Sequence, residues 1–185
     1  DGILVAVTVT DTTPPTTPGT PKEGSASSDK DFDDNGAYSV FWTAASDPES
    51  VVAAYELQER VGTGGTFATL TSTATTTSFA VSGRVHNTQY FYQVRAKNGA
   101  GLFSVFSPVS DGILVDTTNP SAVTVTDDGA TTNVVTQLHA SWTASSDPES
   151  GIAFYQYQIR QDSTAGAIIV NWTSVGLATQ VTRTG

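Results

Sequence analysis

The sequence contains no cysteine and no methionine among its 185 residues. Without cysteine, neither disulfide bonds nor thiolate chemistry can contribute to its stability or activity. Without methionine, we expect the sequence to be a processed product or a segment of a longer protein rather than a complete translated reading frame.

Basic residues are also scarce, since 8 lysines and arginines stand against 18 aspartates and glutamates, for a formal net charge of −10. Contacts with phosphate supply most of the affinity of nucleic-acid-binding proteins, so we expect neither nucleic acid nor an anionic membrane surface as a partner. No apolar run reaches the roughly eighteen residues of a membrane span. We therefore expect no membrane insertion in this segment, and any export signal or anchor to lie outside it.

The residues that are abundant are Thr, Ser, Val, Ala and Gly, whereas Lys, Glu and Leu are sparse. β-Branched residues favour the half-buried surface of a strand. No long segment places apolar residues at the spacing of an amphipathic helix. The composition therefore predicts an all-β protein.

Two similar segments follow one another along the chain. W-T-A-A-S-D-P-E-S begins at Trp42 and W-T-A-S-S-D-P-E-S begins at Trp142, and Tyr55 recurs as Tyr155 at the same offset. D-G-I-L-V occurs at residues 1–5 and again at residues 111–115. A period of about a hundred residues is typical of consecutive domains rather than of solenoid repeats.

Alternating apolar residues predict seven short strands in the first repeat. The clearest alternation is Tyr90, Tyr92, Val94 and Ala96. Further strands are expected at residues 38–43, 52–60, 66–70, 78–81 and 103–115, the last interrupted at Pro108, and one in the proline-rich opening segment. Seven strands in about 105 residues are typical of a β-sandwich.

One run in the first repeat has a recognisable family pattern. Residues 85–101, V-H-N-T-Q-Y-F-Y-Q-V-R-A-K-N-G-A-G, together with Trp42, resemble a fibronectin type III module. The family pattern is L-x-P-x-T-x-Y-x-x-x-V-x-A-x-N-x-x-G. In this sequence Val85 stands for the Leu, and Asn87 stands for the position after the family's usual Pro-Gly turn. The resemblance implies tandem immunoglobulin-like β-sandwiches with seven strands per complete module, and a tyrosine corner at Tyr90. The S-D-G-I-L-V-D-T-T junction resembles linkers in large bacterial-type surface or secreted repeat proteins.

The resemblance implies an unusual division into modules. Residues 1–10 would be the last strand and linker of a preceding module, residues 11–115 a complete module, and residues 116–185 a second module that lacks its last two strands. Since a sandwich without its central strands exposes its core, we expect residues 116–185 not to be stable alone. Either the sequence is part of a longer array, or residues 3–9 of one subunit complete the open module of another by strand exchange. A single donated strand would leave the other still missing.

The repeated S-D-P-E-S joins the second and third strands of each module. Asp opens turns by bonding its own backbone and Pro presets φ, so a scaffold turn is the first interpretation. Acid–base catalysis would need carboxyls that face each other across a cleft, and a loop tip does not provide one. We therefore expect no enzymatic activity.

A cation site is the second interpretation of the acidic loops. Residues 29–36, D-K-D-F-D-D-N-G, begin like a calcium loop, but Asp34 occupies the position that needs Gly and no Glu closes the loop. The alternative is a solvated acidic loop. In a sandwich this loop would lie at the pole that faces the next module, so we hypothesise a calcium ion at the module junction. The hypothetical ligands are Asp29, Asp31, Asp33, Asp34, Asp116, Asp147 and Glu149.

Other candidate sites are weaker. His86 and His139 have no Cys or second His at ligand spacing, so structural roles are expected. Asn171-Trp-Thr is a formal glycosylation acceptor. No cofactor other than calcium is expected.

The sequence thus predicts a non-enzymatic structural or adhesive segment of an extracellular or cell-surface protein, which acts as a spacer or interaction scaffold. The alternatives are a strand-exchanging subunit of an extracellular filament or sheath and an accessory module of a secreted polysaccharide-active enzyme. Expected partners are neighbouring modules or copies of the chain itself, and also other surface proteins or polysaccharide. Because fold does not imply function, these expectations depend on the resemblance.

Overall fold

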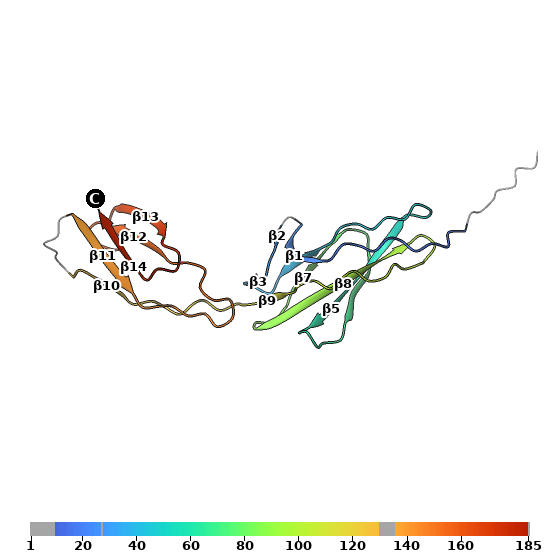
Figure 1. The fold of residues 1–185 in the computed structure, drawn as a ribbon, viewed down its shortest axis with the longest axis horizontal. Helices are drawn as coiled ribbons and strands as arrows, with labels where there is room; N and C mark the ends of the chain where they lie inside the picture. Colours follow the sequence, from blue (N-terminus) through green and yellow to red (C-terminus); the bar gives the residue numbers. More distant parts are fainter. Residues whose placement is uncertain (1–9, 27, 130–135, 185) are drawn as a thin grey trace, which may run out of the picture. The chain divides into compact units, whose positions relative to one another are not determined.

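The computed structural model describes residues 10–26, 28–129 and 136–184, and these residues form strands and loops without a helix (Figure 1). The all-β fold class predicted from composition is therefore confirmed. The chain divides into two compact units, Asp1–Thr117 and Thr118–Gly185. The described residues contain no helix that could cross a membrane.

The first unit is a sandwich of two sheets. The four-stranded sheet has the order β2 (Ser28–Asp29), β1 (Lys22–Ser25), β4 (Tyr38–Phe41) and β7 (Ser78–Val81). The five-stranded sheet has the order β3 (Phe32–Asp33), β9 (Ile113–Val115), β8 (Thr88–Asn98), β5 (Val52–Val61) and β6 (Ala68–Ala74). Its pairs are antiparallel except for β3 with β9, which are parallel. The short strands β2 and β3 were not predicted from the sequence.

The core lies between the two sheets, where the alternation along β8 and β5 directs side chains inward. Leu57, Tyr92, Val94 and Ala96 are fully buried there. Trp42 packs edge-on against Tyr55, with ring centroids 5.6 Å apart.

Two buried tyrosine hydroxyls and one glutamate form a polar group inside this core. The Tyr38 and Tyr92 hydroxyls are 2.8 Å apart, and the Tyr92 hydroxyl donates to Glu59 Oε2 at 2.7 Å. Arg84 Nε lies 2.6 Å from the same oxygen. The core therefore contains a charge, but one that is paired and hydrogen-bonded.

Tyr90 forms the predicted tyrosine corner. Its hydroxyl accepts the backbone N–H of Val85 at 2.9 Å. This bond ties the loop before β8 to β8 itself, as the family resemblance implied.

The expectation of one strand over residues 103–115 is wrong. Phe103 makes only an isolated bridge with Lys97, and a strand resumes only at β9. Between them, serines at every third position face β8, and we call Ser104, Ser107 and Ser110 the serine ladder. Their backbone N–H groups donate to the carbonyls of Ala96, Val94 and Tyr92 at 2.9, 2.8 and 2.9 Å.

The serine hydroxyls complete the pairing of this segment. The Oγ atoms accept the N–H groups of the same three β8 residues at 2.9, 3.1 and 3.0 Å. Each serine thus satisfies both backbone groups of one β8 residue, by its amide and by its side chain. From one serine to the next, the segment advances three residues while β8 advances two, so the segment cannot keep the alternating pattern of a strand.

The second unit repeats the order of the first five main strands. One sheet has the order β10 (Val125–Asp127), β11 (Gln137–Trp142) and β14 (Gln180–Thr184), and β12 (Gln156–Arg160) pairs with β13 (Ile168–Ser174). Within residues 118–129 and 136–184, no strand pairs with the other edge of β12. The unit also has a hollow of about 880 Å³, lined by residues that include Trp142 on β11, Tyr155, and Tyr157 on β12.

Candidate functional site

The S-D-P-E-S loop of the first unit is a turn built on Asp47. Its Oδ1 accepts the N–H groups of Glu49 and Ser50, each at 3.0 Å. Its Oδ2 accepts the side-chain amide of Asn98 at 3.0 Å. The Ser50 N–H and the Asn98 amide hold the pKa of Asp47 below its ordinary value, since both stabilise the charged form. The loop is therefore ordered around an ionised carboxylate.

The same loop holds the segment that leads into the module. Asp11 Oδ2 accepts the Ser50 hydroxyl, and it also accepts the Asn98 amide at 2.7 Å. The Asn98 amide further contacts the Thr13 carbonyl at 2.9 Å, and the Thr13 hydroxyl donates to Glu49. We call this set of Asp11, Thr13, Asp47, Ser50 and Asn98 the clasp. Asn98 lies at its centre and is 2% exposed.

The second unit forms the same turn. Asp147 Oδ1 accepts the N–H groups of Glu149 at 3.2 Å and Ser150 at 3.0 Å. In both units a tyrosine hydroxyl accepts the amide two residues before the Asp, from Ala45 to Tyr55 and from Ser145 to Tyr155. The repeated sequence therefore encodes a local structure.

The carboxylate of Asp33 stabilises a turn. It is 5% exposed, and its Oδ2 accepts the N–H groups of Asn35, Gly36 and Ala37 at 3.2, 2.6 and 3.2 Å. Its backbone carbonyl accepts the N–H of Asp116 at 2.8 Å, which joins β3 to the end of β9.

The other acidic residues predicted in this region lie apart. Asp29 is on β2, while Asp31 and Asp34 are exposed beside β3. Asp116 Oδ1 lies 3.7 Å from His86 Nδ1. Among the described residues, no three of Asp29, Asp31, Asp33 and Asp34 come within metal-binding distance of one another. The hypothesis of calcium at the module junction stays a prediction.

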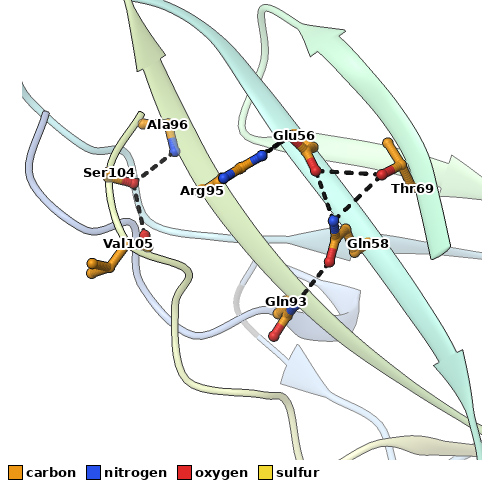
Figure 2. A network of polar contacts seen from close by, with 8 residues as sticks. All are labelled: Glu56, Gln58, Thr69, Gln93, Arg95, Ala96, Ser104 and Val105. Carbon is orange, nitrogen blue, oxygen red and sulfur yellow. Dashed lines mark hydrogen bonds and ion pairs between the residues drawn. The ribbon is translucent and has the colours of Figure 1, made fainter. Parts of the chain in front are cut away.

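A polar network covers the outer face of the five-stranded sheet (Figure 2). Glu56 on β5 accepts two bonds from Arg95 on β8, at 3.1 Å from Nε and 2.8 Å from Nη2. Its other oxygen accepts Gln58 at 2.7 Å and Thr69 at 3.3 Å, and Gln58 in turn accepts the Gln93 amide at 2.8 Å. The network ties β8, β5 and β6 together across their solvent face.

Aromatic rings extend this outer face. The Arg95 guanidinium lies 4.1 Å from the Phe103 ring centroid and 4.6 Å from that of Phe106. Arg60 lies 5.0 Å from the ring centroids of both Phe67 and Phe91. Cations stacked between rings make this face ordered and partly apolar.

Sequence reasoning missed the central residue of the clasp and its first residue. Asn98 entered only as part of a family pattern, and Asp11 only as the first residue of the complete module. Their contacts join positions more than eighty residues apart, which a repeat comparison cannot reveal. The recurrence of D-T-T before each S-D-P-E-S was the one available signal.

Comparisons with known proteins find curated relatives for part of the chain. No protein-family model matches the chain. The chain is 39% identical over 117 residues to Endoglucanase B of Cellulomonas fimi, and 34% identical over 128 residues to Exoglucanase A of the same species. These matches cover 62% and 66% of the chain but only 10% and 14% of the two enzymes.

Parts of two solved structures are also similar to part of this chain. Titin module A71 from human cardiac muscle is 24% identical, with 55% of this chain and 92% of that chain covered at a TM-score of 0.44. A Fn3-like protein from Clostridium thermocellum is 19% identical, with 58% and 99% covered at a TM-score of 0.42.

The architecture of the first unit identifies its fold. It has two sheets in the order described above, a tryptophan packed against a core tyrosine, and a tyrosine corner at Tyr90. In its fold, the first unit is therefore a fibronectin type III-like module.

Proposed function

We propose that this chain is a non-catalytic spacer in an extracellular multidomain protein, and that the parent protein acts on polysaccharide. The proposal that the parent protein acts on polysaccharide is supported by the similarity to Endoglucanase B and Exoglucanase A. The matched stretch covers only a small part of each enzyme. Neighbouring modules would be the direct partners of this segment.

The observation that carries the spacer function is the clasp. A free linker between domains bends at every residue, and its ends approach and separate widely. Here the side chain of Asp11 and the backbone of Thr13 are bound to the pole of the module through Asn98. A linker held in this way transmits the direction of one module to the next.

The paired carboxylates of S-D-P-E-S support a structural function over a catalytic one. Asp47 is occupied by two backbone N–H groups and an amide, and Glu49 accepts the Thr13 hydroxyl. A general acid or base works best with a pKa near the operating pH, and it needs access to a substrate. Asp47 instead has a lowered pKa and is used within the turn.

The clasp can be tested by NMR relaxation of the backbone amides at residues 11–13. We expect order parameters near those of a rigid backbone, about 0.85, in the wild type and below about 0.6 in Asn98→Ala. Thr12→Ala serves as the matched control, because Thr12 is exposed and adjacent to the clasp. Order parameters below about 0.6 in the wild type would show that the segment is a free linker.

The spacer function itself can be tested with spin labels, because the chain has no native cysteine. Gly64→Cys and Thr164→Cys place one label on an exposed loop of each unit. We expect a single narrow distance distribution between the labels, and a broader one when Thr117 and Thr118 are replaced by glycine. A broad distribution in the parent chain would refute a stiff spacer while leaving the clasp measurement valid.

A further inference from the structure

Glu23 is a buried acid without a charge partner. It lies on β1 directly opposite Val40 of β4, and residues opposite each other in an antiparallel pair point to the same face. Val40 is in the core, so Glu23 also points between the sheets, and it is 0% exposed. Neither of its carboxylate oxygens has a hydrogen-bond partner in the described structure.

Two further carboxylates converge on Glu23 from separate segments. Asp29 lies on β2, and Asp111 lies between the serine ladder and β9. One oxygen from each of these three side chains lies within 4.8 Å of the other two. Glu23 is the buried member, whereas Asp29 and Asp111 are exposed. The cluster is therefore closed on the core side and open to solvent on the other.

The backbone fixes the three carboxylates near each other. Asp29 Oδ1 accepts the N–H of Glu23 at 2.9 Å, and the Lys30 N–H donates to the Glu23 carbonyl at 2.9 Å. On the other side, Ser110 pairs with Tyr92 through both its amide and its hydroxyl, which positions Asp111.

Like charges held this closely are unfavourable unless something neutralises them. Within the described chain, no Lys, Arg or His nitrogen forms an ion pair with any of the three carboxylates. Burial raises the pKa of Glu23 to about 7, and the charges of Asp29 and Asp111 act in the same direction. The nearby Ser110 hydroxyl acts in the opposite direction and does not offset these effects. Either a proton or a cation must compensate the group.

We propose that Glu23, Asp29 and Asp111 form a binding site for a calcium ion. The donors are all carboxylate oxygens, which hard cations prefer over nitrogen or sulfur ligands. Calcium takes its oxygen ligands at about 2.3–2.6 Å, so ligands on opposite sides of the ion lie roughly 4.6–5.2 Å apart. The 4.8 Å limit of this cluster fits within that sphere. Magnesium demands near-ideal octahedral geometry and gives up its waters reluctantly, so it should bind this site more weakly.

A calcium ion bound at this site would link the two sheets of the sandwich. The site joins the β1–β2 hairpin of one sheet to the segment that leads into β9 of the other. Water molecules on the open side would complete the coordination. Calcium affinities of extracellular modules lie at about 0.1–1 mM, so millimolar calcium should fill such a site.

The test is a calcium titration of the whole chain followed by two-dimensional amide NMR at neutral pH. We expect saturable shifts of the Glu23, Asp29 and Asp111 amides, and a melting temperature of the first unit raised by several degrees in 5 mM calcium relative to EDTA. Magnesium at equal ionic strength should give a much smaller effect.

Three variants separate this site from general charge screening. Asp111→Asn and Glu23→Gln should lose the calcium-dependent shifts and the rise in melting temperature. Asp34→Asn, which removes an equal charge from an exposed position outside the cluster, should keep both. If Glu23→Gln fails to fold, Asp111→Asn still tests the site. The Asp111 side chain is exposed, so this substitution should not prevent folding.

The proposal is overturned by any of three results. The first is the absence of any saturable shift in the wild type. The second is a set of shifts confined to residues 31–34 or 147–149. The third is an Asp111→Asn variant that responds to calcium like the wild type. The second result would favour the junction hypothesis instead. The first would leave a protonated Glu23 as the compensating state.

Discussion

Replacing Ser107 by alanine tests whether the serine ladder holds the edge of the five-stranded sheet. The hydroxyl of Ser107 accepts the N–H of Val94 at 3.1 Å and donates to the Pro108 carbonyl at 2.9 Å. Val94 is fully buried, so its N–H has no access to water when the hydroxyl is removed. The Ser107 amide still donates to the Val94 carbonyl, so only half of the pairing is lost.

The expected cost follows from that unsatisfied group. A buried donor left without an acceptor costs about 1–3 kcal/mol, so Ser107→Ala should lower the free energy of unfolding by about 2 kcal/mol. Removing all three ladder hydroxyls should cost about 6 kcal/mol, which is comparable with the roughly 5–15 kcal/mol that stabilises a typical domain. The triple variant should therefore be partly unfolded.

Urea denaturation of the chain, monitored by fluorescence, measures the change in the free energy of unfolding. Amide hydrogen exchange then shows whether protection is lost at Val94 in particular. Ser82→Ala is the matched control, because Ser82 is exposed and outside the ladder; it should change stability by less than about 0.5 kcal/mol. A Ser107→Ala variant as stable as this control, with Val94 still protected, would refute the ladder as a stabilising element.

Three further substitutions test separate features of the first unit. Gly112→Ala should destabilise it by more than about 2 kcal/mol in urea denaturation, because φ is 91° there and an added Cβ would lie 2.6 Å from the Phe91 ring. Tyr92→Phe should cost about 1–2 kcal/mol in the same assay, since the Tyr38 hydroxyl and Glu59 each lose a partner. In EDTA, the free energy of unfolding of the wild type should fall by roughly 3 kcal/mol as pH rises from below 4.5 through about 7, whereas that of Glu23→Gln should not show this decrease. Stability falls with rising pH because the folded state keeps a proton on Glu23 that the unfolded state has released. An equal pH dependence in both proteins would contradict the raised pKa of Glu23.

The strands that the sequence predicted are those with an apolar face. Tyr90, Tyr92 and Val94 alternate with outward residues because one side of β8 is core, and that pattern is local. The ladder could not be predicted in this way, because its serines pair with β8 through side chains at a spacing of three. S-x-x-S-x-x-S is nevertheless visible at residues 104–110, and such spacing before a final strand is a signal worth testing elsewhere.

The two parts of the candidate site differ in how far the sequence could define them. The turn on Asp47 is local, so S-D-P-E-S indicated it directly. The clasp depends on Asn98 reaching across the pole to Asp11, and the acid cluster depends on Glu23 facing inward from β1. In a four-residue segment such as K-E-G-S, the sequence alone does not show which side chains point into the core. The register of the segment against β4 decides which side chains point inward.

The second unit carries an acid at the register position that corresponds to Glu23, and it separates the effect of register from that of burial. Asp127 on β10 lies opposite Ala140 of β11, and Ala140 is the counterpart of Val40 at the offset of the repeat. An acid therefore occupies the same register position in both units, although the surrounding residues differ. Asp127 is nevertheless exposed in the second unit, and its Oδ1 accepts the N–H of Gly129 at 2.8 Å, so the charge there needs no further compensation. The need for a compensating proton or cation at Glu23 therefore comes from its burial and not from its register position alone.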